Sequence, residues 1–386
     1  MTILLVTPWN LSDIGGVSVA VRMLASQFRK RGHRVLVLTL DGDGHPRYKE
    51  ETEEASVYSA YLRIPYVEQA PIRGLIGYSL YLPWTLYQLR RLLKRHKVDI
   101  VAIHYPMASA SYFGILRRFS HWKLVVTYQG SDAHELPQWP KIDQFLVKYL
   151  LGGADYIVAV SKSLQLKVLE QFPSLEQRKH YIIPNGAPIE LIDQVSPVDR
   201  PADLPDGYIF SAGLLVPRKG FDVLIKAVAF ARHHGTEIHV VIAGEGPERQ
   251  RLEEMADAND ISTNVKFVGP QSHRSVLTLM KGSRHFVLAS HAEGLPLVIA
   301  EAMACAKAVV ATDVDGASQI VEDGKTGILV KSGDTESLAQ ALIKLHGEPQ
   351  LCEALGRNGR EWALRAFSWD NIADRYLRLF KESVPD

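Results

Sequence analysis

The chain has 386 residues, of which 46% are hydrophobic and 23% are charged, and its formal net charge is +1. This composition is typical of a globular protein and excludes a disordered chain, a collagen and a disulfide scaffold. No apolar run approaches the ~20 residues that span a bilayer, and the apolar N-terminus is too short for a signal peptide, so we expect a cytoplasmic protein.

Short apolar runs alternate with amphipathic helical patterns along the chain. In the first half, the predicted strands are Ile3–Thr7, Val35–Leu40, Ile100–His104, Leu124–Thr127 and Tyr156–Val160, with helices that include Val17–Lys30 and Leu80–His96. In the second half, the predicted strands are Tyr208–Ala212, Ile238–Ala243, Val265–Val268, Phe286–Ala289 and Ala308–Thr312, with helices at Phe221–His233, Glu248–Ala256, Ser272–Met280 and Val298–Ala304. Buried strands that alternate with helices predict two doubly wound α/β domains with parallel sheets.

A proline-rich stretch separates the two series of strands. Five prolines lie between residues 184 and 206, and a segment so rich in proline cannot continue a sheet. We therefore expect an N-terminal domain over residues 1–187, a linker over 188–206 and a C-terminal domain over 207–366. The pattern of Phe367–Phe380 predicts one last helix within residues 367–386.

The two halves of the chain differ in charge. Residues 1–187 hold 23 Lys and Arg against 15 Asp and Glu, whereas residues 188–386 hold 21 against 28. A nearly neutral whole argues against a general nucleic-acid binder. The basic half fits contact with anionic substrates or with an anionic membrane surface, and it equally fits two domains of opposite charge that face each other.

Glycine-rich and basic motifs follow several of the predicted strands, where ligands of open α/β sheets bind. Gly15 and Gly16 lead into a helix, whose free amides and dipole suit an anion; an ordinary loop is the alternative. Arg218 and Lys219 follow Gly213 in a Pro/Gly-rich turn and could neutralise a diphosphate, although a basic pair in a loop is often only a solvated surface feature. Gly244 begins a Gly-Glu-Gly motif, but position 249 is arginine, so dinucleotide binding is rejected.

The most informative segment runs from Glu293 to Glu301. Glu293 lies in the loop after a predicted strand, and Pro296 suits the first turn of the helix that follows. Glu301 lies inside that helix on an otherwise apolar face, where a carboxylate needs a partner. Hydroxyls of a sugar or a ribose are suitable partners for both carboxylates, and the amides near Gly294 suit a phosphate. A capping carboxylate and a partly exposed helix residue are the alternative.

Through these motifs, the chain resembles the retaining, metal-independent glycosyltransferases of family 4, which have the GT-B fold. The resemblance covers nearly the whole length, and Glu293 and Glu301 have the spacing of the family's E-x7-E motif. The other matching motifs are Gly15-Gly16, Gly130-Ser131-Asp132, Val160-Ser161, Ile183-Pro184-Asn185-Gly186, Pro217-Arg218-Lys219-Gly220 and Gly244-Glu245-Gly246-Pro247. The fold implied is two Rossmann-like doubly wound parallel-sheet domains that face a central cleft.

The resemblance implies that a sugar is transferred, with retention, from a nucleotide diphosphate sugar to a glycan, a lipid-linked saccharide or a small molecule, without a metal or other cofactor. The nucleotide would bind the second domain and the acceptor the first, with the final helix packed back on the first. The implied catalytic residues are Glu293 at the donor sugar, Lys219 and Arg218 at the diphosphate, and Gln129. The implied donor-binding residues are Gly15, Gly16, Asp132, Gly213, Gly244, Gly294, Leu295 and Glu301, the last of these at the ribose.

Two positions depart from the family pattern. The family usually has histidine where Gln129 stands and arginine where Leu214 stands, and glutamine does not titrate. These changes mark either a subgroup with its own donor contacts or a weakened enzyme. Two alternatives therefore stay open: a non-catalytic nucleotide-sugar-binding protein and a GT-B-type sugar-nucleotide epimerase.

The stretch from Ile72 to Lys97 combines aromatic and aliphatic residues with a basic end. Such a segment is one signature of binding at the surface of an anionic membrane, which would place the protein peripherally at the inner face of the membrane. A core helix with a solvated basic face is the other interpretation.

Overall fold

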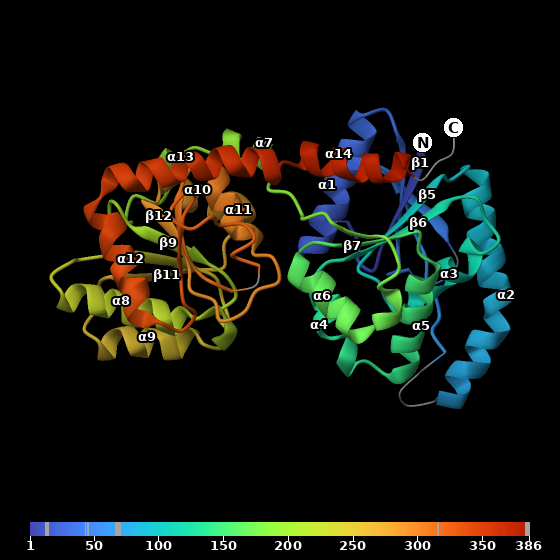
Figure 1. Cartoon of the computed structure of the whole chain (residues 1–386), viewed down its shortest axis with the longest axis horizontal. Helices are drawn as coiled ribbons and strands as arrows, with labels where there is room; N and C mark the ends of the chain where they lie inside the picture. The colour runs from blue at the N-terminus through green and yellow to red at the C-terminus, as the bar shows by residue number, and fades with distance from the viewer. Residues whose placement is uncertain (12–14, 43, 45, 66–70, 315, 383–386) are drawn as a thin grey trace. The chain divides into compact units, whose positions relative to one another are not determined.

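The computed structural model describes residues 1–11, 15–42, 44, 46–65, 71–314 and 316–382 (Figure 1). The chain divides into two compact units. Unit 1 contains residues 1–185 and 369–386, and unit 2 contains residues 186–368. Each unit is built on its own sheet of mainly parallel strands, so the predicted class of two doubly wound α/β domains is confirmed.

Unit 1 begins with the strand at the N-terminus of the chain. Its strands are β1 (Thr2–Thr7), β2 (Arg34–Thr39), β3 (Arg47–Glu51), β4 (Ser56–Ser59), β5 (Ile100–His104), β6 (Lys123–Tyr128), β7 (Tyr156–Ala159) and β8 (His180–Ile182). Its helices are α1 (Gly16–Lys30), α2 (Pro71–Arg95), α3 (Ser111–Arg117), α4 (Ser131–His134), α5 (Lys141–Gly153), α6 (Lys162–Gln171) and α14 (Trp369–Lys381). The strand order is β3-β4-β2-β1-β5-β6-β7-β8, and β3 alone among the described strands runs antiparallel to its neighbour.

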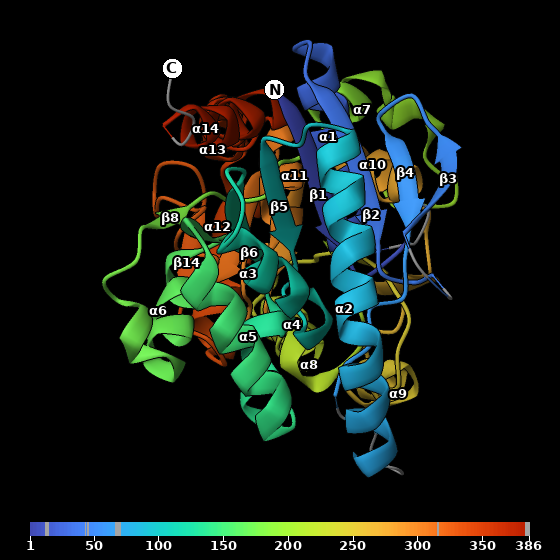
Figure 2. The same ribbon diagram turned by 90° about the vertical axis from the view of Figure 1, so that its right-hand side faces the viewer.

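The central strands of unit 1 are buried on both faces. Leu4 of β1 lies opposite Leu36 of β2 and Val101 of β5, and all three are fully buried. Helices α1 and α14 pack on one face of the sheet, whereas α2, α3 and α5 lie on the other side (Figures 1 and 2). Continuous apolar runs therefore predicted these strands correctly, since both of their faces need apolar side chains.

The C-terminal helix α14 belongs to unit 1 because of its apolar face and its charges. The ring of Phe380 packs 5.7 Å from that of Phe28 in α1, and Tyr376 is almost fully buried. Arg31, at the end of α1, pairs with Asp370 at 3.2 Å and with Asp374 at 2.8 Å. Burial of the apolar face, at about 25 cal/mol per Å², supplies most of the attachment, and the exposed ion pairs add little.

Unit 2 contains the rest of the chain. Its strands are β9 (Ile209–Ala212), β10 (Val240–Ala243), β11 (Val265–Gly269), β12 (His285–Leu288), β13 (Ala308–Thr312) and β14 (Ile328–Val330). Its helices are α7 (Ile189–Gln194), α8 (Phe221–His233), α9 (Arg249–Ala258), α10 (His273–Gly282), α11 (Leu297–Ala304), α12 (Thr335–Gly347) and α13 (Pro349–Ala366). The parallel strands follow the order β11-β10-β9-β12-β13-β14, which is the Rossmann order, and it reverses direction between β9 and β12.

Two apolar cores, one on each face of the sheet, hold unit 2 together. Helices α8, α9 and α12 cover one face, and α7, α10 and α11 cover the other (Figure 1). Helix α13 contributes to both cores, with Cys352 and Leu355 in the first and Ala363 in the second. Side chains of β9 and β12 point alternately into the two cores, so that Ile209 faces one and Phe210 the other. The sheet is therefore a rigid platform for the loops at its carboxyl edge.

The predicted linker over residues 188–206 is not a linker in the structure. Helix α7 lies within it, and Ile192, Val195 and Leu204 are buried in the core of unit 2. The division between the units falls after Asn185, and it falls again after Ser368 where the chain returns to unit 1. The prolines correctly excluded a strand here. A helix of six residues, followed by single buried apolar residues, is too short for its hydrophobic periodicity to be recognised in the sequence.

Helix α2 begins at Pro71, nine residues before the predicted Leu80, and it continues past Pro83. Proline suits the first turn of a helix, as at Pro71, whereas Pro83 lies inside both the predicted and the observed helix. Among the described residues, no helix combines the length and the apolar character needed to cross a membrane.

The turn after β10 depends on Gly244, which yields a first prediction. Gly244 has φ = +147°, and a Cβ there would overlap the carbonyl oxygen of Gly213. Gly244→Ala should lower the free energy of unfolding of unit 2 by several kcal/mol, because backbone strain costs about 1–3 kcal/mol and steric overlap about as much again. Gly235→Ala is the matched control, since Gly235 also has a positive φ (+80°) but has open space around it; it should cost about 1–2 kcal/mol. Equal losses in urea unfolding would contradict the packing argument.

Candidate active site

The reversal of strand order in unit 2 defines where a ligand can bind. The loops after β9 and β12 follow the two strands between which the order reverses. In open α/β sheets, ligands bind at such a switch point, beyond the carboxyl ends of the strands. The loop after β9 carries Arg218 and Lys219, and the loop after β12 carries Glu293. Two motifs that lie far apart in the sequence therefore meet at one edge of the sheet.

Lys219 and Glu293 form an ion pair at this edge. The Lys219 Nζ atom donates to Glu293 Oε1 at 2.6 Å, and the hydroxyl of Ser290 donates to the same oxygen at 2.6 Å. The side chains are only 17% and 8% exposed. Removal of one partner would leave the other charge buried and unpaired, which is strongly destabilising. The ion pair therefore favours one fixed arrangement of the two side chains.

The backbone of the Lys219 loop is fixed by close contacts to its neighbours. Residues Pro217–Lys219 form a 3-10 turn that ends at Gly220, whose φ is +62° and whose Cβ would overlap the carbonyl oxygen of Ala289. The His291 amide donates to the Arg218 carbonyl at 2.8 Å and ties this loop to the one that carries Glu293. The aliphatic part of Lys219 lies over Gly213, where a Cβ would come within 3.8 Å of it.

This packing assigns Gly213 and Gly244 a structural part in the site. Gly244 must lack a side chain so that the end of β10 can approach Gly213, and Gly213 in turn supports the Lys219 side chain. The Gly-x-Gly motif therefore shapes the loop after β9, which agrees with the rejection of dinucleotide binding. Both glycines act on the site through the position of Lys219.

Helix α11 presents Glu301, which has a partner that the sequence did not predict. The Oε1 atom of Glu301 is 2.8 Å from His273 Nε2 of α10, and Glu301 is 14% exposed. The hydrogen bond that His273 donates to the Glu301 carboxylate raises the pKa of His273 above its usual 6.5. Nothing in the local sequence pairs two residues 28 positions apart, whereas the packing of α10 against α11 brings them together.

The residues before α11 leave backbone amides available. Pro296 is the N-cap of α11 and offers no side-chain cap, and the helix starts at Leu297. Gly294 and Leu295 precede it and are partly exposed. The first N–H groups of a helix without a cap are free to donate hydrogen bonds to a phosphate or a carboxylate.

Arg218 and Leu214 are exposed in the loop after β9. Leu214 is 57% exposed, and the guanidinium of Arg218 makes no ion pair or hydrogen bond with any part of the chain that the structure describes. Lys219 is held by Glu293, so Arg218 is the cation of this loop that is left open to solvent. Its position is compatible with the predicted diphosphate contact.

In unit 1, Gln129 is held by the side chains of His104 and Asn185, a contact that the sequence did not predict. Its Nε2 lies 3.0 Å from His104 Nδ1, and its Oε1 accepts from Asn185 Nδ2 at 2.7 Å. Burial lowers the pKa of His104 to about 4, so this imidazole is neutral near pH 7. Gln129 therefore bridges the ends of β5 and β8, and its orientation is set by these two partners.

Asp132 holds the turn that follows Gln129. It is fully buried, and its carboxylate accepts from the backbone amides of Gln129, Gly130 and Ala133 at 2.7–3.1 Å. Burial raises the pKa of Asp132 to about 7, against the opposing effect of these N–H donors. With its oxygens occupied and no surface exposed, Asp132 shapes the predicted donor-binding loop from beneath.

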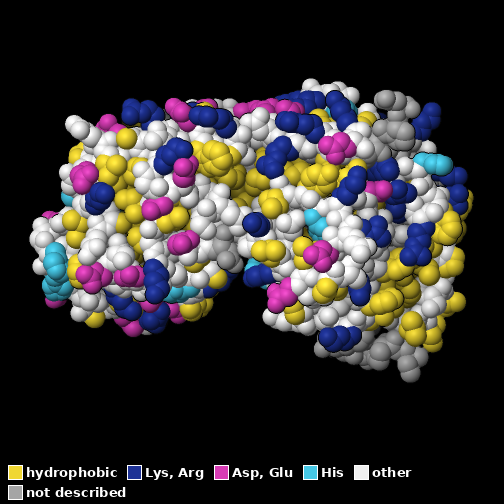
Figure 3. Space-filling model, viewed as in Figure 1, with side chains coloured by type: hydrophobic (Ala, Val, Ile, Leu, Met, Phe, Trp, Pro, Cys, Tyr) yellow, Lys and Arg dark blue, Asp and Glu magenta, His cyan; other side chains and the backbone are white. Residues whose placement is uncertain are grey.

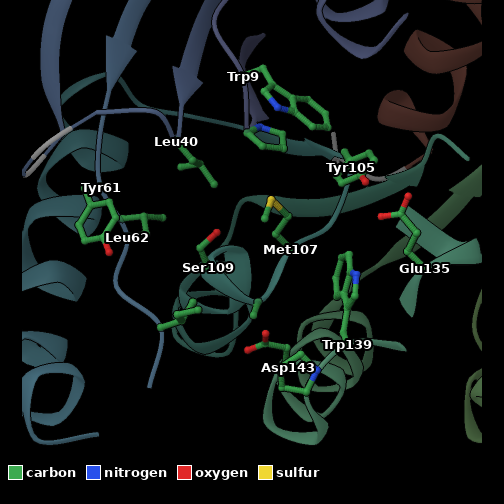
Figure 4. Close-up of a pocket in the computed structure, with 14 residues that line it drawn as sticks. Trp9, Leu40, Tyr61, Leu62, Tyr105, Met107, Ser109, Glu135, Trp139 and Asp143 are labelled. Carbon is green, nitrogen blue, oxygen red and sulfur yellow. The ribbon is translucent and has the colours of Figure 1, made fainter. Parts of the chain in front are cut away.

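The carboxyl edge of the unit 1 sheet contains a pocket of about 580 Å³ (Figure 4). Its lining comes from the segments after β1, β2, β4, β5 and β6, as expected for an open sheet at its switch point. Trp9, Tyr105 and Trp139 lie on one side, and Tyr61 and Leu62 lie on the other. The pocket is thus a mainly aromatic and apolar site, the usual character of a small-molecule site.

Two carboxylates, Glu135 and Asp143, enter this pocket, and none of the described residues that line it is Lys, Arg or His. Burial raises the pKa of Asp143. The Asp143 Oδ1 atom is shielded from solvent and lacks a hydrogen-bond partner among the described residues. A buried polar atom of this kind indicates a site that a ligand or a water molecule completes.

A smaller cavity of about 220 Å³ adjoins the N-terminus of α1. Gly15 is the N-cap and Gly16 the first residue of α1, and added Cβ atoms would meet nothing within 4 Å at either position. Trp9 and Tyr105 line both this cavity and the larger pocket, with their rings 4.7 Å apart. Tyr105 has φ = +67°, an unusual conformation for a residue other than glycine, and such strain is concentrated at functional sites.

Among the described residues, no three His, Cys, Asp or Glu side chains gather in a way that could hold a metal ion.

The geometry and the comparisons with known proteins agree. The model of "Glycosyltransferase Family 4" matches residues 14–191, and that of "Glycosyl transferases group 1" matches residues 196–362. Two Rossmann-like units with switch-point sites are the GT-B fold, and Anabaena HepE in complex with UDP has a similar structure, with a TM-score of 0.72 at 18% identity over 99% of this chain and all of that one. The chain belongs to the glycosyltransferases of this two-domain family, so the predicted resemblance is confirmed.

Relatives with similar sequences extend over nearly the whole chain. An uncharacterized glycosyltransferase of Methanocaldococcus jannaschii is 26% identical over 96% of this chain and 95% of its own length. The phosphatidyl-myo-inositol mannosyltransferase of Mycobacterium leprae is 25% identical over 99% of this chain and 96% of its own length. The similarity to glycosyltransferases therefore covers both units of the chain.

The contact between His273 and Glu301 yields a second prediction. Because the pKa of His273 is raised in the folded state, the stabilisation is complete below the unfolded value of about 6.5 and is lost as the pH rises through the folded value. His273→Gln should therefore lower the free energy of unfolding at pH 5.5, by at most about 1 kcal/mol since His273 is 44% exposed, and should have no effect at pH 8.5. Urea unfolding at both pH values checks this, and a loss that is the same at both would contradict it.

Proposed function

We propose that this glycosyltransferase moves a sugar from a nucleotide diphosphate sugar bound to unit 2 onto an acceptor bound to unit 1, with retention at the anomeric carbon and without a metal ion. The observation that supports it most is the buried ion pair between Lys219 and Glu293 at the switch point of unit 2. The UDP in the similar HepE structure supports a nucleotide donor. Retention is supported by the Glu293 to Glu301 spacing that resembles the family motif.

The proposed donor site divides the work among three groups. The Lys219 ammonium, with Arg218 beside it, stabilises the negative charge that develops on the diphosphate as its bond to the anomeric carbon breaks. The Oε2 atom of Glu293 accepts a hydrogen bond from a hydroxyl of the donor sugar, since Oε1 already accepts from Lys219 and Ser290. Glu301 accepts ribose hydroxyls, with His273 orienting its carboxylate.

Metal independence follows from the charges proposed at this site. Two cations and the uncapped amides at the start of α11 supply the positive charge that other transferases obtain from a divalent ion. Preorganised donors of this kind each contribute about 2.7–4 kcal/mol to transition-state stabilisation.

The acceptor that we propose for unit 1 is a neutral or amino-bearing ring with several hydroxyls, free or at the end of a glycan or a lipid-linked saccharide. Trp9, Tyr105 and Trp139 offer flat apolar surfaces to the apolar face of such a ring. Asp143 and Glu135 can accept its hydroxyl or ammonium hydrogens. The same two carboxylates, without a cation among the lining residues that the structure describes, repel a ring that carries phosphate or carboxylate.

The donor site yields a third prediction, measured as nucleoside diphosphate release in the presence of acceptor. Lys219→Ala and Glu293→Ala should each reduce turnover on the order of 10²–10³-fold, and Arg218→Ala on the order of ten- to a hundredfold. Arg357→Ala, an exposed arginine elsewhere in unit 2, is the control and should change nothing. Thermal melting of each variant separates a loss of activity from a loss of fold.

The same assay tests the finer parts of the proposal. Activity should persist in EDTA, and the product should have the anomeric configuration of the donor by NMR. Activity that EDTA abolishes and Mg²⁺ or Mn²⁺ restores would overturn metal independence, and an inverted product would overturn retention. Sugar release that needs no acceptor would favour an epimerase, and donor binding without turnover on any acceptor would favour a binding protein.

The acceptor pocket yields a fourth prediction. Trp139→Ala should raise the KM for the acceptor about tenfold, since an aromatic contact with its buried area contributes on the order of 1.5 kcal/mol, and should leave the KM for the donor unchanged. Phe119→Ala is the control, because Phe119 is 75% exposed and does not line the pocket. In an acceptor screen, phosphorylated or uronic rings should be poorer acceptors than their neutral counterparts. A preference for the anionic rings would refute the proposed acceptor class.

A further inference from the structure

Helix α2 exposes apolar and aromatic side chains along much of its length. The exposed residues are Leu75, Ile76, Leu80, Tyr81, Trp84 and Tyr87, with Leu80 at 72% and Trp84 at 46% exposure. Figure 3 shows hydrophobic side chains gathered at the edge of unit 1 where α2 lies in Figure 1. Contiguous apolar surface of this kind marks an interaction site on a globular protein.

The exposed residues form a continuous stripe. Ile76, Leu80, Trp84 and Tyr87 recur at intervals of three or four residues, so they lie on one face of the helix. The rings of Trp84 and Tyr87 stack at 5.7 Å on this face. The opposite face, with Leu89, Leu92 and Leu93, is buried against the rest of unit 1. The exposed stripe therefore takes no part in the core.

The C-terminal half of α2 is strongly basic, and Lys97 follows it closely. Arg90, Arg91, Lys94, Arg95 and Lys97 are all exposed, and residues 71–98 contain no Asp or Glu. The apolar stripe and the basic cluster therefore share one solvent-facing side of unit 1. A partner that fits both must be apolar beneath an anionic surface.

We propose that α2 docks unit 1 on the surface of an anionic phospholipid bilayer. In this position the helix lies in the plane of the interface, with Ile76 and Leu80 among the upper acyl chains. Trp and Tyr are suited to the level of the headgroups, and the basic cluster is attracted by anionic headgroups. A second copy of this chain is a poorer occupant, because two identical basic clusters that face each other repel.

Docking through α2 has a consequence for the acceptor, which rests on the proposed function. Arg63 lies 4.4 Å above the ring of Tyr81 in α2, and its neighbours Leu62 and Ile64 line the pocket of unit 1. The wall of the acceptor pocket and the docking helix are therefore in direct contact. A membrane-held acceptor, with its saccharide end free to enter the pocket, fits this arrangement.

The test is co-sedimentation of the full chain with vesicles of phosphatidylcholine alone or mixed with phosphatidylglycerol. Wild-type protein should bind the mixed vesicles, bind the neutral ones at least tenfold more weakly, and dissociate as salt is raised. The triple variant Leu80→Ser, Trp84→Ser, Tyr87→Ser should lose at least tenfold in affinity. The double variant Lys94→Gln, Arg95→Gln should lose roughly 25-fold, at about fivefold per cation.

Matched controls remove exposed groups of the same kinds elsewhere. Leu166→Ser takes away an apolar side chain that is 56% exposed on α6, and the pair Lys344→Gln, Arg357→Gln takes away two exposed cations of unit 2. Both controls should bind vesicles as wild type does. Equal losses in controls and α2 variants would overturn the proposal, as would wild-type protein that fails to bind mixed vesicles at low salt.

Two further measurements keep the outcomes separate. If α2 instead joins two copies, analytical ultracentrifugation without lipid will show a dimer that the triple variant abolishes, which would also overturn membrane docking. Turnover with a free, soluble acceptor should be unchanged in the α2 variants, because no residue of α2 is placed in the donor or acceptor site. Vesicle binding that persists in a protein without any transferase activity would refute the proposed function and leave the docking intact.

Discussion

The ion pair between Lys219 and Glu293 depends on how closely three strand ends approach one another in unit 2. Gly220 lies against the carbonyl of Ala289 at the end of β12, and Gly244 lies against the carbonyl of Gly213 after β9. A methyl group at either position would push the Lys219 loop away from Glu293. The glycines of both motifs are thus needed to bring two charged loops to hydrogen-bonding distance, and the chemistry of unit 2 follows from that distance.

The ion pair between Lys219 and Glu293 costs hydration of both charges, and it orients the Lys219 ammonium before a donor binds. Two charges that are at most 17% exposed have lost much of their hydration, and their mutual attraction with the Ser290 hydrogen bond offsets that loss. An arriving diphosphate would meet an ammonium that is already desolvated and oriented. Arg218, which is exposed and unpaired within the described residues, would still have to be ordered. The two adjacent cations are therefore unequal, and the larger expected effect of Lys219 follows.

The sequence predicted the buried parts of the fold well and the exposed parts poorly. All ten predicted strands exist, and most of them are apolar runs that are buried on both faces, whereas β11 is a partly buried edge strand that contains Lys266. The strands β3, β4, β8 and β14 were not predicted, and β3, with the sequence Arg-Tyr-Lys-Glu-Glu, is fully exposed and pairs only with β4. The helices α3 to α7, α12 and α13 were also not assigned. Of the site, residue types and loop positions were readable, whereas the contacts His273–Glu301 and Gln129–His104–Asn185 join elements that only the tertiary structure brings together.

The structure also shows where the excess positive charge of the N-terminal half lies, which the charge count alone does not reveal. A basic N-terminal half could have lined a pocket for an anionic acceptor, yet the described lining of the unit 1 pocket includes Glu135 and Asp143 and no basic residue. Five of the cations lie instead from Arg90 to Lys97, all exposed, beside an apolar stripe. The excess positive charge is therefore carried in part by a surface helix and excluded from the pocket. The same half of the chain can then attract an anionic surface with one element and select a neutral or cationic acceptor with another, because the two sets of charges do not share a site.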